Sequence, residues 1–232
     1  MIKRIRLQPL VSLKNEFVLG YEALYRKEVW ADFPSATAIV EAIFQNYDFD
    51  SHLYVNMAPN DATDPNFARD FLKTLDRMKI SRKNIVLEVS ESTNPEFIKL
   101  IKRNLGFLRS RGVKIALDDF GTEYSTLSFL QELPVDIVKI DRKFVQMSPF
   151  SKKARSIMKF TVQVSHDLGC KVVAEGIETT ASLDCVADAG ADIGQGFIFS
   201  AVEQKPSPFV SFYELLSGPI KTPLKACYCA GL

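Results

Sequence analysis

The sequence lacks the features that mark membrane, secreted and zinc-binding proteins. No apolar stretch approaches the roughly 18 residues that a membrane span requires, so no membrane association is expected. Residues 1–13 contain basic side chains but no apolar run of the kind found in a secretory signal. The four cysteines, Cys170, Cys185, Cys227 and Cys229, lack the paired C-x-x-C spacing of a metal site. These absences favour a cytoplasmic protein with reduced thiols, although the C-x-C pair could bind a soft metal or oxidise.

A strong charge of either sign is also missing. Lysine and arginine total 29, aspartate and glutamate total 28, and the net charge is +1. No overall field therefore attracts a nucleic acid polymer or an anionic membrane, and a phosphate-bearing ligand would need a local site. No repeats or linkers appear before about residue 218. We expect one domain over residues 1–217 and a tail over 218–232. The chain shows no sensor, receiver or cyclase domain, so regulation is expected from outside the chain or from its assembly state.

Short apolar runs of β type alternate with amphipathic segments of helical period. The expected strands cover residues 3–9, 17–24, 52–57, 84–89, 113–118, 136–140, 171–175 and 193–196. The expected helices cover residues 35–47, 66–78, 95–110, 125–132, 152–168, 180–189 and 208–216. Strands that alternate with helices form a parallel sheet, and eight of them in 232 residues favour a closed barrel.

The first connection is too short for a parallel crossover. Only residues 10–16 separate the first two predicted strands, whereas a crossover needs about a dozen residues or more. A turn at Lys14 and Asn15 makes these strands antiparallel neighbours. We therefore predict an α/β fold, a TIM-like (β/α)8 barrel with an antiparallel first strand, in a single domain.

Seven apolar runs lead into polar side chains, most of which are carboxylates. These side chains are Glu22, Asn56, Glu88, the pair Asp118 and Asp119, Lys139, Glu175 and Gln195. Taken singly, each residue is more simply a turn former, an ion-pair partner or a solvated charge. In a barrel the C-terminal ends of the parallel strands open on one face, where barrel enzymes have their active sites. We expect the side chains to converge there, with Asp119 already on the loop, because neighbouring side chains on a strand point apart.

Five carboxylates gathered around one lysine are costly unless cations compensate their charge. Carboxylate and amide oxygens are hard ligands, so the sequence predicts Mg²⁺ or Mn²⁺ rather than zinc. Two such ions, sharing a carboxylate of the pair Asp118 and Asp119, suit the attack of water on a phosphodiester. Lys139 could position or deprotonate that water or neutralise the transition state, and Arg26 could clamp a phosphate. From these residues alone, sugar-phosphate or carbonyl chemistry is an equal alternative.

The motifs resemble those of the EAL-domain cyclic di-GMP phosphodiesterases of bacterial signalling. The matching segments are YEALYR (21–26), VNMAPN (55–60), LEVSES (87–92), residues 116–141, VVAEGIET (172–179) and DIGQGFIFS (192–200). The resemblance covers residues 5–215 and implies a barrel with a reversed first strand. It also implies hydrolysis of cyclic di-GMP to linear pGpG with Mg²⁺ or Mn²⁺, inhibition by Ca²⁺ and a homodimer, and it leaves room for a regulatory protein partner.

The resemblance assigns roles to individual residues. Metal binding is expected of Glu22, Asn56, Glu88, Asp118, Asp119 and Glu175. Lys139 is expected to contact the attacking water and, with Glu175 and Glu22, to form the catalytic group. Substrate contacts are expected of Gln8, Leu24, Arg26 and Gln195, and the positioning of the loop after Asp119 is expected of Glu91 and Glu178.

The chain departs from the family pattern in two places. Glu123 stands where the family usually has glycine, and an added carboxylate there would repel substrate phosphate and change the rate. The segment between Glu22 and Asn56 is shorter than usual, which removes part of a helix and a loop. The alternative function is a catalytically weak or inactive EAL-type barrel that senses cyclic di-GMP or docks onto a protein. Such members usually lack a metal ligand, and none is missing here. An unrelated metal-dependent barrel enzyme is a third hypothesis.

Overall fold

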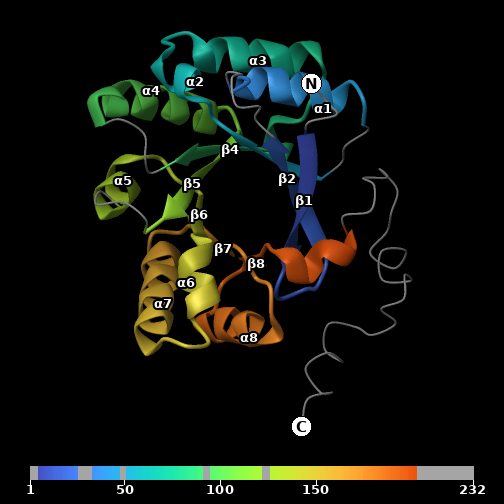
Figure 1. Cartoon of the computed structure of the whole chain (residues 1–232). Coiled ribbons are helices and arrows are strands. Elements are labelled where there is room, and N and C mark those ends of the chain that lie inside the picture. Colours follow the sequence, from blue (N-terminus) through green and yellow to red (C-terminus); the bar gives the residue numbers. More distant parts are fainter. Residues whose placement is uncertain (1–4, 26–32, 48–50, 91–94, 122–125, 203–232) are drawn as a thin grey trace.

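Eight strands close into a barrel in the order in which they occur along the chain (Figure 1). The computed structural model describes residues 5–25, 33–47, 51–90, 95–121 and 126–202. The strands are β1 (Ile5–Ser12), β2 (Val18–Tyr25), β3 (His52–Asn56), β4 (Ile85–Ser90), β5 (Lys114–Phe120), β6 (Ile137–Ile140), β7 (Lys171–Ala174) and β8 (Ile193–Gly194). The predicted α/β barrel is confirmed.

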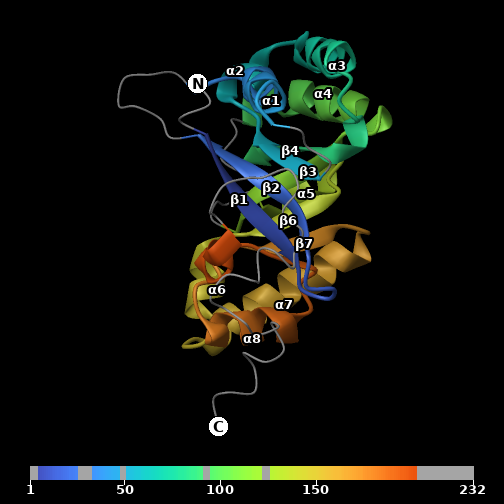
Figure 2. The same cartoon turned by 90° about the vertical axis from the view of Figure 1, so that its right-hand side faces the viewer.

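One strand of the barrel is reversed. Strand β1 is antiparallel to both of its neighbours, β2 and β8. The other six neighbouring pairs are parallel. Residues 13–17 join β1 to β2, and Figure 2 shows the two strands as a long hairpin. The short first connection therefore has the consequence predicted from its length.

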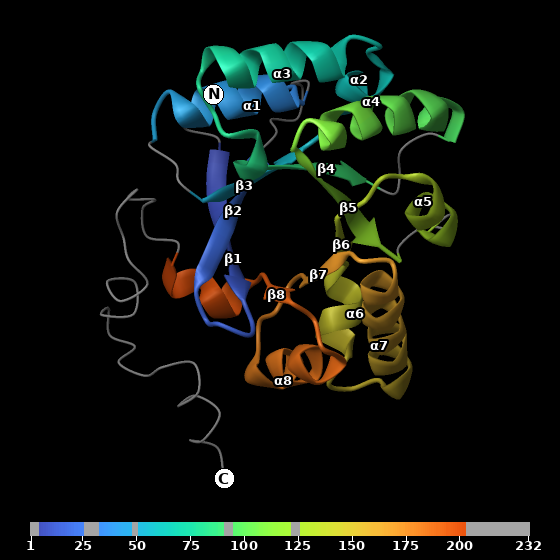
Figure 3. The ribbon, with the colours of Figure 1, turned by 180° about the vertical axis from the view of Figure 1, so that it is seen from behind.

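Helices surround the barrel on its outer side. They are α1 (Ala36–Phe44), α2 (Pro59–Thr63), α3 (Phe67–Arg77), α4 (Ile98–Ser110), α5 (Thr126–Glu132), α6 (Arg142–Met147), α7 (Lys152–Asp167) and α8 (Thr180–Ala189). Helices α1 to α4 lie on one side of the barrel and α6 to α8 on the opposite side (Figures 1 and 3). Short 3-10 helices cover Arg82–Asn84, Pro95–Phe97 and Phe197–Val202. The predicted helix at 208–216 and the predicted boundary at 217 lie outside the described residues.

The core has layers on both faces of the sheet. Outside the strands, apolar side chains such as Phe71, Leu105 and Met158 are fully buried between the sheet and the helices. Inside the barrel, a separate apolar layer consists of Leu10, Tyr54, Val86, Ala116, Ile137, Val173 and Ile193. None of the helices in the described part of the chain has the length and apolar character needed to cross a lipid bilayer.

Candidate active site

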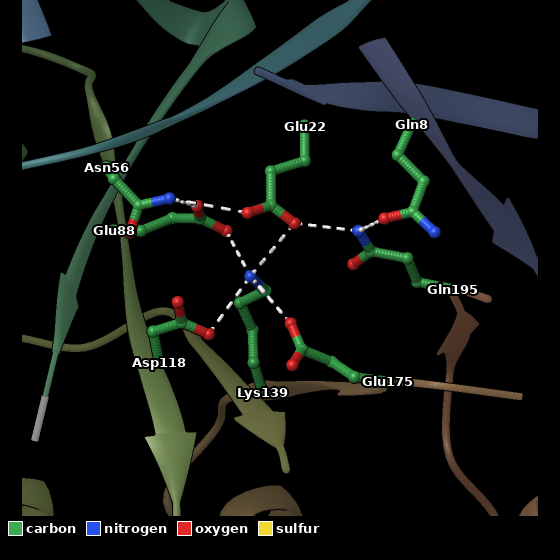
Figure 4. Close-up of polar contacts among 8 residues, drawn as sticks. All are labelled: Gln8, Glu22, Asn56, Glu88, Asp118, Lys139, Glu175 and Gln195. Atoms are coloured by element: carbon green, nitrogen blue, oxygen red, sulfur yellow. Dashed lines mark hydrogen bonds and ion pairs between the residues drawn. The ribbon is translucent and has the colours of Figure 1, made fainter. Parts of the chain in front are cut away.

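The polar site lies directly above the apolar layer inside the barrel. Side chains two residues apart on a strand point to the same side, so the residue two positions beyond each interior apolar residue also points inward. Beyond Tyr54, Val86, Ala116, Ile137, Val173 and Ile193 these residues are Asn56, Glu88, Asp118, Lys139, Glu175 and Gln195. On the β1–β2 hairpin, Gln8 stands opposite Glu22 in the strand register. The structure thus brings these predicted residues to one end of the barrel (Figure 4).

Lys139 is the centre of this group and is fully buried. Its Nζ lies 2.6 Å from Glu88 Oε1 and 2.7 Å from Glu175 Oε1. The same nitrogen lies 3.0 Å from Asp118 Oδ1 and 3.3 Å from Glu22 Oε2. Figure 4 shows the four carboxylates converging on it from four different strands or strand ends. One cation therefore faces four acids in a region that is largely closed to water.

Two amide side chains complete the ring of polar contacts. Asn56 donates from Nδ2 to Glu88 Oε2 at 3.0 Å and to Glu22 Oε1 at 3.3 Å. In this arrangement the amide nitrogen faces the acids, so ligation of a cation by Asn56 requires its amide to turn over. Gln195 donates from Nε2 to Glu22 Oε2 at 2.7 Å and to Gln8 Oε1 at 3.0 Å (Figure 4).

Asp119 reaches the site by a different route from the one predicted. We expected it on the loop, but it lies within strand β5. The pairing of β5 with β6 shifts register between Leu117 and Phe120, and Asp119 has a left-handed backbone with φ of 57°. This bulge changes the direction of the side chain, because the strict alternation of a regular strand is broken there. As a result, oxygens of Asp118, Asp119 and Glu175 lie within 4.8 Å of one another.

The electrostatics of the site show more acid than its lysine can compensate. Burial, and then the nearby Glu22, raise the pKa of Glu88 well above its usual value despite Lys139. Burial also raises the pKa of Glu175 to about 8, again against the attraction of Lys139. The pKa of Asp119 is raised by burial and by Asp118. These acids are therefore ready to exchange protons for metal cations.

The arrangement of the acids fits two divalent cations. Oxygens of Glu22, Glu88 and Asp118 also lie within 4.8 Å of one another. This cluster shares Asp118 with the cluster of Asp118, Asp119 and Glu175 described above. Among the described residues, the buried Gln195 Oε1 has no hydrogen-bond partner, and the buried Glu88 Oε1 and Asp118 Oδ1 have only the Lys139 ammonium beside them. Buried oxygens with so few donors are the expected partners of a hard cation.

A pocket of about 790 Å³ opens above these acids. The predicted substrate residues Gln8, Leu24 and Gln195 line it, as does Glu178, which accepts a hydrogen bond of 2.9 Å from Gln146 Nε2 on α6. Arg26, Glu91 and Glu123, to which the sequence also assigned roles, lie outside the described residues, as do Cys227 and Cys229. A purely local site at the barrel mouth therefore has room for a ligand larger than a single phosphate.

Sequence reasoning missed several residues of the pocket wall. Asp141 is buried, lines the pocket and caps α6 by accepting from the Lys143 backbone N–H at 2.9 Å. Its position two residues after Lys139 was an available signal. Phe197 lines the pocket with 65% of its surface exposed, and Arg6 lines it from β1. Arg6 could have been found because it precedes Gln8 by two residues on a predicted strand.

The fold and the site together define an α/β barrel with one reversed strand and an acidic mouth suited to metal ions. This chain belongs to the EAL domain family, whose family model matches residues 33–201. Cyclic di-GMP phosphodiesterase PdeA of Borreliella burgdorferi is 33% identical over 159 residues, which cover 68% of this chain and 23% of that protein. An uncharacterised protein of Azorhizobium caulinodans is 35% identical over 148 residues, and there the match covers 64% of this chain and 20% of the relative. The chain thus spans well under half of these relatives.

Solved structures agree with the fold. A standalone EAL protein from Vibrio cholerae in its c-di-GMP-bound form is 27% identical, has a TM-score of 0.73, and matches over 83% of this chain and 89% of its own. The calcium and c-di-GMP complex of BlrP1 from Klebsiella pneumoniae is 26% identical, has a TM-score of 0.72, and matches over 84% of this chain and 54% of its own.

Proposed function

We propose that this protein hydrolyses a phosphodiester bond of cyclic di-GMP to give linear pGpG, with Mg²⁺ or Mn²⁺ as cofactor. The observation that carries the proposal is that two clusters of three acidic side chains lie beneath the pocket and have Asp118 in common. The activity named for the Borreliella relative and the ligand of the Vibrio structure support cyclic di-GMP as the substrate.

The proposed metal ligands divide into two sets. Glu22, Glu88 and Asp118 would hold one ion, with Asn56 beside them, and Asp118, Asp119 and Glu175 would hold the other. When bound, the two ions supply Lewis-acid stabilisation of the charge that develops on the phosphoryl group. Binding removes the repulsion among the acids, because each ion brings two positive charges to a group that otherwise relies on Lys139.

Lys139 acts as a cation and not as a base in this proposal. Burial alone would lower its pKa, but Asp118, Glu175, Glu22 and Glu88 hold the pKa well above its usual value. Without metal, the ammonium group therefore stays protonated at neutral pH. Of the three roles that the sequence left open for it, this favours positioning the water and neutralising the transition state over deprotonating the water.

Glu175 links the proposed metal site to the pocket. Without metal, burial raises its pKa to about 8, so binding of an ion near neutral pH would displace a proton from this carboxyl. Its side chain keeps 17% exposure and lines the pocket, whereas Glu88 is fully buried. Glu175 can thus reach both the solvent and the proposed ions.

The wall of the pocket suits a ligand with planar bases. Leu24 is 37% exposed and Phe197 is 65% exposed, and both line the pocket. Exposed apolar surface of this kind can pack against a guanine ring. Gln8 uses its Oε1 to accept from Gln195, which leaves its Nε2 available as a donor to the substrate.

Turnover of cyclic di-GMP with Mn²⁺, followed by chromatography of the product, tests the proposal. The wild-type chain should produce pGpG, and Glu22→Gln should lower kcat at least about 100-fold because a metal ligand is lost. Glu132→Gln, the same change on the exposed side of α5, is the matched control and should leave the rate unchanged. Tight binding of cyclic di-GMP with no product under Mg²⁺ or Mn²⁺ would instead support the non-catalytic sensor.

Three further expectations stay predictions. They are inhibition by Ca²⁺, assembly as a homodimer with or without a regulatory protein, and a cytoplasmic location. A turnover assay with Ca²⁺ in place of Mn²⁺ checks the first, and measurement of the solution mass checks the second.

A further inference from the structure

The rim of the pocket carries a cation to which the sequence gave no role. Arg6 on β1 lines the pocket and is exposed. Within the described chain, its guanidinium takes part in no hydrogen bond or ion pair. Arg142 and Lys143 also line the pocket, but they are the first two residues of α6 after the buried acid Asp141, which lines the same pocket. Among these three lining cations, Arg6 is the one with no carboxylate within two residues of it in the sequence.

The strand register gives the position of Arg6 relative to the acids. Arg6 stands opposite Leu24, as Gln8 stands opposite Glu22. Residues two apart on a strand point to the same side and are separated by about 7 Å along it. The Arg6 side chain thus begins one layer further out than Gln8, on the wall that Leu24 also forms.

This position is complementary to the ligand of the proposed function. A cyclic dinucleotide contains two phosphodiester groups. Only one of them can bind at the acidic floor of the pocket, that is, at the carboxylates of the two proposed metal sites, where the metal ions would compensate the negative charge. The other phosphate lies away from the floor and needs a positive partner of its own, since the floor carries negative charge. The planar fork of an arginine matches phosphate oxygens. Because no described residue pairs with Arg6, binding a phosphate breaks none of the ion pairs of the described chain.

We propose that Arg6 binds the phosphate of cyclic di-GMP that is not hydrolysed, and that it thereby selects substrates with two phosphodiester groups. The inference rests on the proposed function, because it assumes that the other phosphate lies at the acidic floor. Arg6 is a specificity residue in this account, since it touches the substrate away from the reacting bond.

Steady-state kinetics of Arg6→Gln on two substrates test the inference. Cyclic di-GMP has two phosphodiester groups, whereas bis(p-nitrophenyl) phosphate has one, and both report on the same acidic floor. The ratio of kcat/KM for cyclic di-GMP to that for bis(p-nitrophenyl) phosphate should fall about tenfold, mainly through KM, as expected for the loss of a charged hydrogen bond. Arg6→Lys should recover part of the ratio, because it keeps the charge without the fork. Arg69→Gln, the same change on the exposed side of α3, should keep the wild-type ratio.

The outcomes separate this inference from the function on which it rests. An unchanged ratio in Arg6→Gln, with the wild type active on both substrates, overturns the role of Arg6 and leaves the hydrolase intact. An equal loss on both substrates also overturns it, because the effect is then not specific to the second phosphate. If the wild type hydrolyses neither substrate, equilibrium dialysis of cyclic di-GMP decides. Weaker binding by Arg6→Gln than by Arg69→Gln supports the inference, and equal or absent binding contradicts it.

Discussion

Lys139 illustrates how one residue can hold an active site together before any cofactor arrives. Four carboxylates contact its Nζ, and its own surface is fully buried. Removing one partner of a buried ion pair leaves uncompensated charge, which typically costs about 3–5 kcal/mol. The acids can reduce this cost by taking up protons, so the effect should depend on pH.

We predict that Lys139→Met is less stable than the wild type by about 3 kcal/mol at pH 8 in EDTA, and by less at pH 5. Mn²⁺ should restore much of the loss, because it supplies the missing positive charge. Urea unfolding at pH 8 and at pH 5, each in EDTA and in Mn²⁺, measures this. A variant as stable as the wild type at pH 8 in EDTA would show that the lysine does not compensate the acids.

The raised pKa of Glu175 predicts how stability depends on pH without metal. Between the unfolded pKa near 4.5 and the folded pKa of about 8, the folded state binds more protons at this carboxyl than the unfolded state does. The contribution of Glu175 therefore makes the free energy of unfolding fall as the pH rises through this window. In Glu175→Gln, which has no proton to lose there, urea unfolding in EDTA should give a shallower decrease between pH 5 and pH 8. An identical slope in both proteins would contradict the assignment.

At the residue scale, the sequence predicts most of the site but not its details. The positions of Glu88, Asp118 and Lys139 could be predicted, because a charged side chain at the end of an apolar barrel strand lies at the C-terminal mouth of the barrel. The bulge that turns Asp119 inward within the strand could not, because a bulge depends on the register between β5 and β6. The hydrogen bonds of Asn56 depend on its neighbours in space and leave no trace in its sequence context.

Among the elements, α1 and α2 depend on a single buried carboxylate. Asp61 Oδ2 accepts from the backbone N–H of Ala36 at 2.8 Å and from that of Ala58 at 3.0 Å. It thereby satisfies donors at the first turn of α1 and just before α2, immediately after the strand that ends at Asn56. Burial raises the pKa of Asp61 in spite of these two donors.

We predict that Asp61→Ala lowers the free energy of unfolding by about 1–3 kcal/mol, because two buried N–H groups lose their acceptor. Asp61→Asn should lose less than half as much, since one amide oxygen can serve both donors as Oδ2 does now. Equilibrium unfolding in urea compares the two variants. Equal losses would mean that the negative charge, and not the acceptor, is what stabilises these helices.

The elements that the sequence did not predict share a physical reason. Helices α2 and α6 have five and six residues, too few to show a helical period. The reversal of β1, by contrast, follows from connection length alone. The longer helices α3, α4 and α7 also emerge from their periodicity, with ends that differ from the prediction by up to three residues.

For the whole molecule, eight alternating units in 232 residues leave few arrangements other than a closed barrel. The seven interior apolar residues and the polar residues above them follow from the same two-residue alternation, so the closed barrel itself creates the acidic mouth. The pocket wall was less predictable. Arg6 on β1 and Phe197, which follows β8, line the same pocket only because the pairing of β1 with β8 closes the barrel.

The anomalous scattering of crystals grown with Mn²⁺ tests the central claim most directly, namely that two divalent cations fill this mouth. We predict two manganese peaks per chain, one among Glu22, Glu88 and Asp118 and one among Asp118, Asp119 and Glu175. Asp118 should contact both. Crystals soaked in excess Mn²⁺ that show no peak at these carboxylates, with Lys139 still paired to all four acids, would contradict it.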